Sequence, residues 1–127
     1  MPINQLTQEV IGAAIEVHKF LGPGLLESAY EECLCHELNL RKIRFERQLE
    51  MPVTFKGTRL NSGYRIDLLV DKLVVVEVKS VAELVPIHEA QILTYLRLSK
   101  CQVGLLFNFN VVVMKHGIKR VVLNFQE

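Results

Sequence analysis

Two stretches near the N-terminus repeat apolar residues at the spacing of an α-helix. From residue 7 to residue 20 they recur every three or four positions, and Gly22-Pro23-Gly24 then interrupts the pattern. The same period resumes over residues 25–40, without an internal Pro or Gly. The pattern predicts two helices joined by a tight turn.

Beyond Arg44 the period changes to two, the spacing of a strand with one buried face. Alternation predicts strands over residues 45–50, 53–56 and 64–70, with a turn over residues 57–63. Residues 73–78 are almost continuously apolar, which is typical of a strand covered on both faces. These segments therefore predict three or four strands after the two helices.

The C-terminal part returns to helix and then to strands. Residues 86–100 follow the helical period, with Pro86 in the first turn. Strands are expected over residues 103–109, 111–115 and 119–125, the last two paired as a C-terminal β-hairpin around His116-Gly117. The strand-helix-strand unit over residues 73–109 implies a right-handed parallel crossover within a mixed sheet.

The element order predicts one α/β (α+β) domain over residues 1–127. No internal repeat or shift in composition marks a domain boundary, and a chain of this length can bury a core of its own. No apolar run approaches the roughly 20 residues of a membrane span, and no secretory signal is visible. We therefore expect a soluble, cytoplasmic protein without a membrane partner.

The three cysteines and the net charge exclude little. Cys33 and Cys35 lie two positions apart on a predicted helix and would point to different faces, so a structural zinc is not expected. With Cys101 they form an odd set of thiols that we expect to be reduced. The net charge of +1 neither supports nor excludes a nucleic-acid partner.

Candidate chemistry centres on Asp67, Glu77 and Lys79. Each of the two acids interrupts an apolar strand, where an ionised group without a partner is costly. Lys79 lies two residues after Glu77 and so projects from the same face. Two carboxylates suit Mg²⁺ or Mn²⁺. The alternative is a solvated Asp67 and a same-face ion pair of little net worth.

The strands around Asp71 are expected to pair antiparallel, with Asp67 opposite Glu77. Only an even sum of residue numbers puts both side chains on one face, which requires an odd-length loop or a bulge. Without metal, two such acids in a partly dry pocket should repel, so that at least one titrates above its ordinary pKa.

Two helical stripes carry further polar residues. Gly24, Glu27 and Tyr30 follow one stripe of the second helix, and Glu27 could reach the carboxylates. His88, Gln91 and Tyr95 follow one stripe of the third helix, where Gln91 could orient a substrate or a metal-bound water. Each also has an ordinary role: a helix-start acid for Glu27, a core residue for Tyr30 and a surface residue for His88.

Together these residues resemble the GxxExxY family, a branch of the PD-(D/E)XK nuclease superfamily. The motifs that carry the resemblance are Gly24-Leu25-Leu26-Glu27-Ser28-Ala29-Tyr30, Ile66-Asp67, Glu77-Val78-Lys79, Gln91-Ile92-Leu93-Thr94-Tyr95 and Gly104-Leu105-Leu106-Phe107-Asn108-Phe109. They span nearly the whole chain. Ile66 stands where the superfamily's name has a proline.

The resemblance implies a restriction-endonuclease-like α-β-β-β-α-β core and a metal-dependent phosphodiesterase site. In that site Asp67 and Glu77 would ligate the metal with the Val78 carbonyl, and Lys79 would be catalytic. Glu27 and Gln91 would complete the pocket. We also expect substrate contacts from three residues, namely Tyr30, His88 and Tyr95.

The leading functional hypothesis is a Mg²⁺- or Mn²⁺-dependent nuclease acting on DNA. The alternative is a catalytically silent module that binds nucleic acid or protein on the same scaffold, and the near-neutral charge favours a component that depends on a protein partner. We also expect a homodimer, because the predicted C-terminal hairpin presents more β-branched surface than a small sheet must bury.

Overall fold

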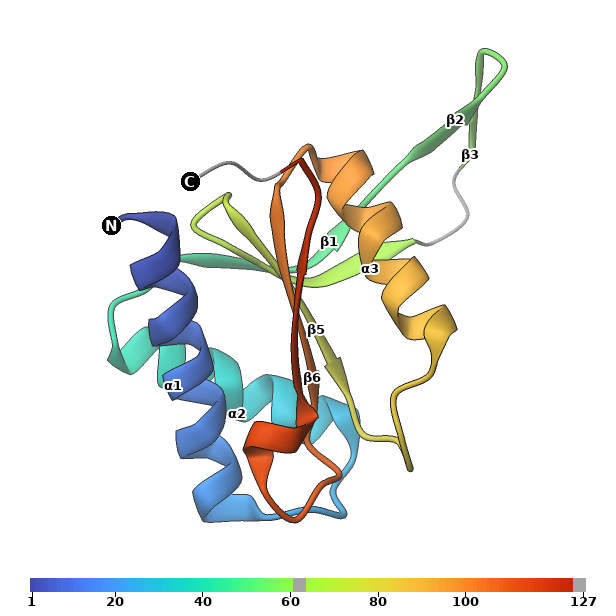
Figure 1. Ribbon diagram of the computed structural model, residues 1–127. Helices are drawn as coiled ribbons and strands as arrows, with labels where there is room; N and C mark the ends of the chain where they lie inside the picture. The colour runs from blue at the N-terminus through green and yellow to red at the C-terminus, as the bar shows by residue number, and fades with distance from the viewer. Residues whose placement is uncertain (61–63, 125–127) are drawn as a thin grey trace.

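A five-stranded mixed sheet lies in the middle of the protein (Figure 1). This computed structural model describes residues 1–60 and 64–124. The strands, in spatial order, are β1 (Phe45–Glu50), β4 (Arg65–Val70), β5 (Val74–Lys79), β6 (Val103–Asn108) and β7 (Ile118–Val122). β5 and β6 are parallel, and every other neighbouring pair is antiparallel. The predicted mixed sheet is confirmed.

Helices cover both faces of the sheet. α1 (Ile3–Leu21) and α2 (Glu27–Leu40) pack on one face, and α3 (Pro86–Ser99) packs on the other (Figure 1). Successive residues of β5 serve the two layers in turn, since Val74 and Val76 join the core under α1 and α2 while Val75 joins the core under α3. This double coverage explains why β5 is apolar almost throughout.

The turn between the first two helices is fixed by Tyr30. Gly22 and Gly24 have φ angles of 67° and 96°, in the left-handed region that favours glycine. The Tyr30 hydroxyl donates to the Gly22 carbonyl and accepts from the Leu25 N–H, and its ring stacks on Phe109 at 4.6 Å. The glycines and the tyrosine together set where α2 begins.

A two-stranded hairpin stands apart from the main sheet (Figure 1). It consists of β2 (Val53–Phe55) and β3 (Thr58–Leu60), joined by Lys56 and Gly57. The turn predicted over residues 57–63 is therefore wrong at residues 58–60, which form a strand. Residues 61–63 of that prediction lie outside the described residues.

The strand predicted over residues 111–115 and its hairpin are wrong. Residues 109–113 form a loop, a 3-10 helix follows over Met114–Gly117, and β7 pairs with β6 instead. The valines of this segment favour a strand, but β6 already pairs with β5 on one side and with β7 on the other. The Val111 carbonyl is held by His18 Nε2 at 2.7 Å, and Met114 is buried in the core. The expected end of the last strand, at residue 125, lies outside the described part of the chain.

None of the helices in the described residues is long and apolar enough to cross a bilayer.

Gly117 is required by its close approach to β6. A Cβ added there would lie 2.0 Å from the Asn108 carbonyl oxygen, whereas one added at Gly12 would meet only the flexible Arg41 guanidinium at 3.0 Å. Gly117→Ala should therefore lower the free energy of unfolding by about 1–3 kcal/mol or more. Gly12→Ala should cost little, because alanine favours the helix and Arg41 can move. Urea denaturation measures the free energy of unfolding of both variants. Equal losses would contradict the close contact at Gly117.

Candidate active site

β4 and β5 separate at the point where their acids lie. Their ladder runs from Val70 and Val74 to Leu68 and Val76, across a three-residue turn. The antiparallel pairing and the odd loop length are confirmed. The ladder ends one residue short of Asp67 and one residue short of Glu77, so the predicted opposition of these two acids on one face of the sheet stays a prediction.

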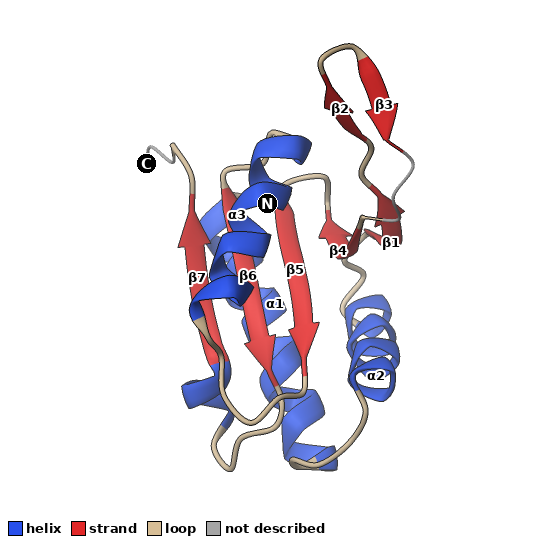
Figure 2. Ribbon diagram, turned by 90° about the vertical axis from the view of Figure 1, so that its right-hand side faces the viewer, coloured by secondary structure: helices blue, strands red, loops and turns tan. Residues whose placement is uncertain are grey.

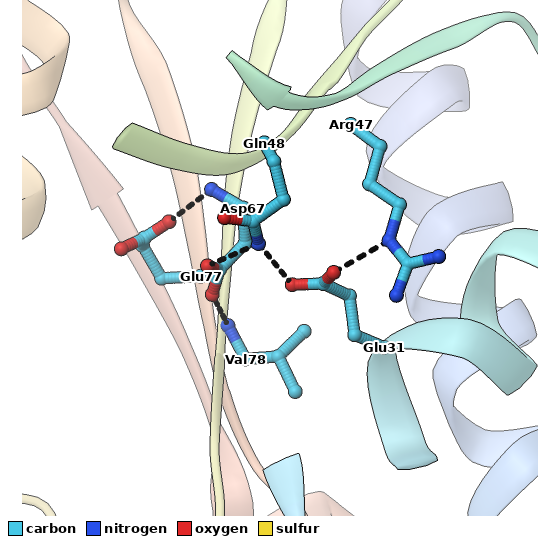
Figure 3. Close-up of polar contacts among 6 residues, drawn as sticks. All are labelled: Glu31, Arg47, Gln48, Asp67, Glu77 and Val78. Carbon is cyan, nitrogen blue, oxygen red and sulfur yellow. Dashed lines mark hydrogen bonds and ion pairs between the residues drawn. The ribbon is translucent and has the colours of Figure 1, made fainter. Parts of the chain in front are cut away.

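At this point hydrogen bonds to side-chain carboxylates replace the backbone hydrogen bonds of the ladder (Figure 3). The Asp67 N–H donates to Glu77 Oε2 at 2.8 Å, and the Val78 N–H donates to Asp67 Oδ2 at 2.8 Å. Each strand thus supplies a carboxylate to the backbone of the other. This exchange fixes both acids beside each other where the strands part.

Burial makes this acid pair electrostatically unfavourable. Glu77 is only 3% exposed, and burial, followed by the charge of Asp67, raises its pKa to about 8. Burial also raises the pKa of Asp67, against the lowering effect of the Val78 N–H. The positive charge of Lys79 opposes both shifts without removing them. When both acids are ionised, the pair therefore has more negative charge than its surroundings neutralise.

Lys79, Gln91 and Tyr95 form a row beside the acids. Lys79 Nζ donates to Gln91 Oε1 at 3.3 Å, and Gln91 Nε2 donates to the Tyr95 hydroxyl at 3.4 Å. Gln91 and Tyr95 are four residues apart on α3 and share one side of that helix. Tyr95 is buried, and desolvation followed by the charge of Glu77 raises its pKa. The structure thus brings together five of the predicted site residues.

A third carboxylate, Glu31, joins the site and was missed by the sequence reasoning. Gln48 Nε2 donates to Glu31 Oε1 at 2.8 Å and to Asp67 Oδ1 at 3.3 Å, and Arg47 Nε donates to Glu31 Oε2 at 2.6 Å (Figure 3). Glu31 is 6% exposed, and its charge contributes to the raised pKa of both Asp67 and Glu77. One amide therefore links the acid of α2 to the acid of β4.

Gln48 reaches both acids because its backbone leaves the ordinary strand conformation. Its φ angle is 53°, and the β1–β4 ladder passes from Arg47 and Leu68 directly to Leu49 and Ile66. A non-glycine residue in the left-handed region stores strain of about 1–3 kcal/mol, which is typical of functional sites.

Glu27 is the first residue of α2, and its side chain reaches the end of β5. The Ser80 N–H donates to Glu27 Oε2 at 3.4 Å, while Ser80 Oγ donates to the Leu25 carbonyl at 2.7 Å. Glu27 therefore contacts the residue that follows Lys79. Glu31 is four residues later on the same side of the helix, and that spacing is the signal that could have found it.

Tyr30 and His88 take part in local structure. Tyr30 is fully buried, with its hydroxyl bound to backbone atoms as described above. His88 Nδ1 accepts the Val85 N–H at 3.0 Å at the start of α3. The hydrogen bonds that the structure gives these two side chains are to backbone, and their predicted contacts with substrate stay predictions.

The oxygen donors of the site fit a hard divalent cation. Among the described residues, no group of three or more His, Cys, Asp or Glu side chains is arranged to enclose a metal ion by itself. Mg²⁺ commonly binds through one or two carboxylates and completes its shell with water and substrate phosphate. Asp67 and Glu77, with the Val78 carbonyl, have that chemistry, and their uncompensated charge would attract such an ion.

A surface hollow of about 700 Å³ lies elsewhere. Its lining includes Lys42, Arg44, Asp71 and Lys72, at the end of β4 opposite to Asp67. The acid pair therefore lies where two strands separate, away from this hollow.

The raised pKa of Glu77 predicts how stability depends on pH. The folded protein binds this proton more tightly than the unfolded chain does, because the folded pKa is about 8 against an ordinary 4.5. The contribution of Glu77 to stability should be greatest below pH 4.5 and fall as the pH rises toward 8. Glu77→Gln, which cannot ionise, should gain stability relative to wild type over this range, on the order of a few kcal/mol.

Denaturation in EDTA at several pH values between 5 and 9 measures this difference, with the exposed strand acid Glu46→Gln as the control. A constant difference between Glu77→Gln and wild type across the range would contradict the buried acid pair.

Comparison with known protein families agrees with this geometry. The family model for the PD-(D/E)XK nuclease superfamily matches residues 4–121. Searches of curated proteins and of solved structures gave no match. Nucleases of this superfamily generally use divalent metal ions and act on nucleic acid. Since the match extends from the first turn of α1 into β7, the chain belongs to the PD-(D/E)XK nuclease superfamily.

Proposed function

We propose that this protein is a metal-dependent nuclease that hydrolyses phosphodiester bonds of DNA at Asp67, Glu77 and Lys79. The observation that carries the proposal is the buried acid pair, held by reciprocal hydrogen bonds to the opposite strand, with Lys79 beside it. A structural ion pair on the surface would need neither the burial nor the hydrogen bonds from backbone N–H groups to the two carboxylates. Family membership supports nuclease chemistry in general.

Mg²⁺ or Mn²⁺ held by Asp67, Glu77 and the Val78 carbonyl would polarise the phosphate and lower the pKa of a bound water. The remaining residues would position the reacting groups. Lys79 would stabilise negative charge on the phosphate oxygens. Gln91 holds the Lys79 ammonium, and Tyr95 in turn holds the Gln91 amide.

Glu31 and Gln48 would act on Asp67 rather than on the substrate. Gln48 Nε2 donates to Asp67 Oδ1. The same nitrogen also donates to Glu31 Oε1, and this second hydrogen bond fixes the orientation of the Gln48 amide. Arg47 offsets part of the charge that Glu31 brings to the site. Supporting residues of this kind restrict the orientation of metal ligands.

The turn before α2 supports membership in the GxxExxY branch. Gly24 takes a positive φ angle, Glu27 receives the Ser80 N–H, and Tyr30 ties the turn to the core. Gly24 and Tyr30 thus shape the turn, while Glu27 contacts the residue that follows β5. Glu27 would then act by holding the chain beside Lys79.

A homodimer, a protein partner and a cytoplasmic location stay predictions. The predicted hairpin on which the dimer rested is not formed, but Val112 and Val113 of the same segment are 87% and 50% exposed. Light scattering at working concentration would distinguish a dimer from a monomer.

Replacing Lys79 tests the enzyme directly. Purified protein with Mg²⁺ or Mn²⁺ should cleave at least one of single-stranded, double-stranded and branched DNA. Lys79→Ala should reduce the rate by about 10²-fold or more, since a group that stabilises transition-state charge is lost. Lys115→Ala, an exposed lysine of the 3-10 helix, is the matched control and should cleave normally. Wild-type protein that binds DNA without cleaving it would favour the silent binding module.

Metal binding should stabilise the folded protein. At neutral pH and fixed ionic strength, Mg²⁺ or Mn²⁺ at a hundredfold excess over its Kd should add about 2.7 kcal/mol. The effect should be weaker near pH 4, where protons compete for the carboxylates. Melting curves of wild type, Asp67→Asn and Glu77→Gln measure the response. A metal-induced rise of equal size in all three would place the binding site elsewhere.

A further inference from the structure

The β2–β3 hairpin projects away from the body of the protein (Figures 1 and 2). We refer to residues Val53–Leu60 as the arm. From Thr54 onward every arm residue is exposed, including the large apolar side chains Phe55 (61%) and Leu60 (41%). The arm has no role in the site as described, and exposed apolar residues gathered on one projection are typical of an interaction surface.

The arm and its base carry positive charge only. Between Glu50 and Asp67 the sequence contains Lys56, Arg59 and Arg65 but no Asp or Glu. Setting these three aside leaves twelve basic residues against the fourteen acids in the rest of the chain. The near-neutral net charge therefore conceals a basic projection on an otherwise slightly acidic protein.

The tip holds its cation in a strained conformation. Lys56 and Gly57 have φ angles of 47° and 82°, as in the two-residue turns that favour Asn-Gly or Gly-Gly. Lysine in the first of these positions costs stability, because its Cβ is crowded there. The Lys56 ammonium lies 5.4 Å from the centre of the Phe55 ring. A cation and an aromatic face are thus both presented at the outermost point of the hairpin.

The arm lies between β1 and β4 in the sequence, and β4 carries Asp67 of the acid pair. The β1–β4 ladder reaches Glu50 and Arg65, and the Met51 N–H then donates to the Tyr64 carbonyl at 2.8 Å. Arg65 is exposed and lies two residues before Asp67 on β4. In Figure 2 the arm extends upward from the ends of β1 and β4. A chain bound along the arm would be directed toward the point where β4 and β5 part.

We propose that the arm is a nucleic-acid-binding ribbon whose Lys56 and Arg59 contact backbone phosphates, with Phe55 against a sugar or base. This inference rests on the proposed nuclease function for the identity of its ligand. The site itself presents the carboxylates of Asp67, Glu77 and Glu31, which repel a polyanion, so a substrate needs positive charge elsewhere on the protein. The arm supplies it and leaves the site residues free for the reacting phosphate.

Salt-dependent DNA binding tests the arm without requiring cleavage. The arm variant combines Lys56→Asn, which creates the preferred Asn-Gly turn, with Arg59→Thr, which suits a strand. The control removes two exposed lysines from the helical side of the protein by Lys19→Gln and Lys115→Gln. Fluorescence anisotropy in EDTA measures binding to labelled single-stranded and duplex DNA over a range of salt concentrations.

The arm variant should bind more weakly than the control, with a shallower dependence of log K on log salt. The slope should fall by about 0.7 per lost phosphate contact on single strands and about 0.9 on duplex. Phe55→Ser should weaken single-stranded binding more than duplex binding, because only unpaired bases can stack on the ring.

Slopes and affinities equal to those of the control would overturn the arm proposal, while cleavage by wild type would still support the nuclease. Wild-type protein that neither binds nor cleaves DNA would overturn both. A melting temperature close to that of wild type would establish that the arm variant is folded.

Discussion

The rest of the site depends on two hydrogen bonds between β4 and β5, in which a carboxylate of each strand accepts a backbone N–H of the other. Beyond Leu68 and Val76 the two strands no longer pair through their backbones, and Asp67 and Glu77 accept the N–H groups instead. Unpaired backbone donors in the interior are costly, so the strands can separate only because the acids satisfy them. The same bonds fix the two carboxylates beside each other in a buried place.

Separation of the strands has an electrostatic cost that the surroundings reduce only in part. Lys79 from β5 and the backbone N–H that each acid accepts lower the pKa of these acids, whereas burial and the neighbouring Glu31 raise it. α2 supplies Glu31, β1 supplies Gln48 in a strained conformation, and α3 supplies Gln91. Four elements thus contribute side chains around an acid pair whose ionised form is unfavourable without a cation. This is the pattern expected of a site that trades stability for function.

Much of this arrangement could be predicted from the chain. The apolar run of β5 and the helix after it predicted a parallel β5–β6 pair, and the alternation around Asp71 predicted an antiparallel β4–β5 pair with a loop of odd length. These predictions held because they depend on periodicity and register, which local sequence determines. Lys79 was selected because it follows Glu77 by two residues, and Gln91 because it interrupts an apolar helix face; in the structure the two side chains are in contact.

Predictions failed where tertiary contacts override local preference. The valines of residues 111–113 favour a strand, yet β7 occupies the edge of β6 and leaves that segment as a loop. Glu31 was missed because Glu27 was predicted to be the acid of this helix that reaches the carboxylates, whereas Glu27 contacts Ser80. Gln48 gave no signal at all, since its reach depends on a positive φ angle that no sequence pattern marks for glutamine.

The claim that Asp67 and Glu77 share one cation is tested most directly by anomalous diffraction from crystals grown with Mn²⁺. We expect a manganese peak within coordination distance of a carboxylate oxygen from each residue, about 2.2 Å away, with the Val78 carbonyl as a further ligand. Manganese bound elsewhere on the protein, with the two carboxylates contacting only Lys79 and the backbone, would contradict it.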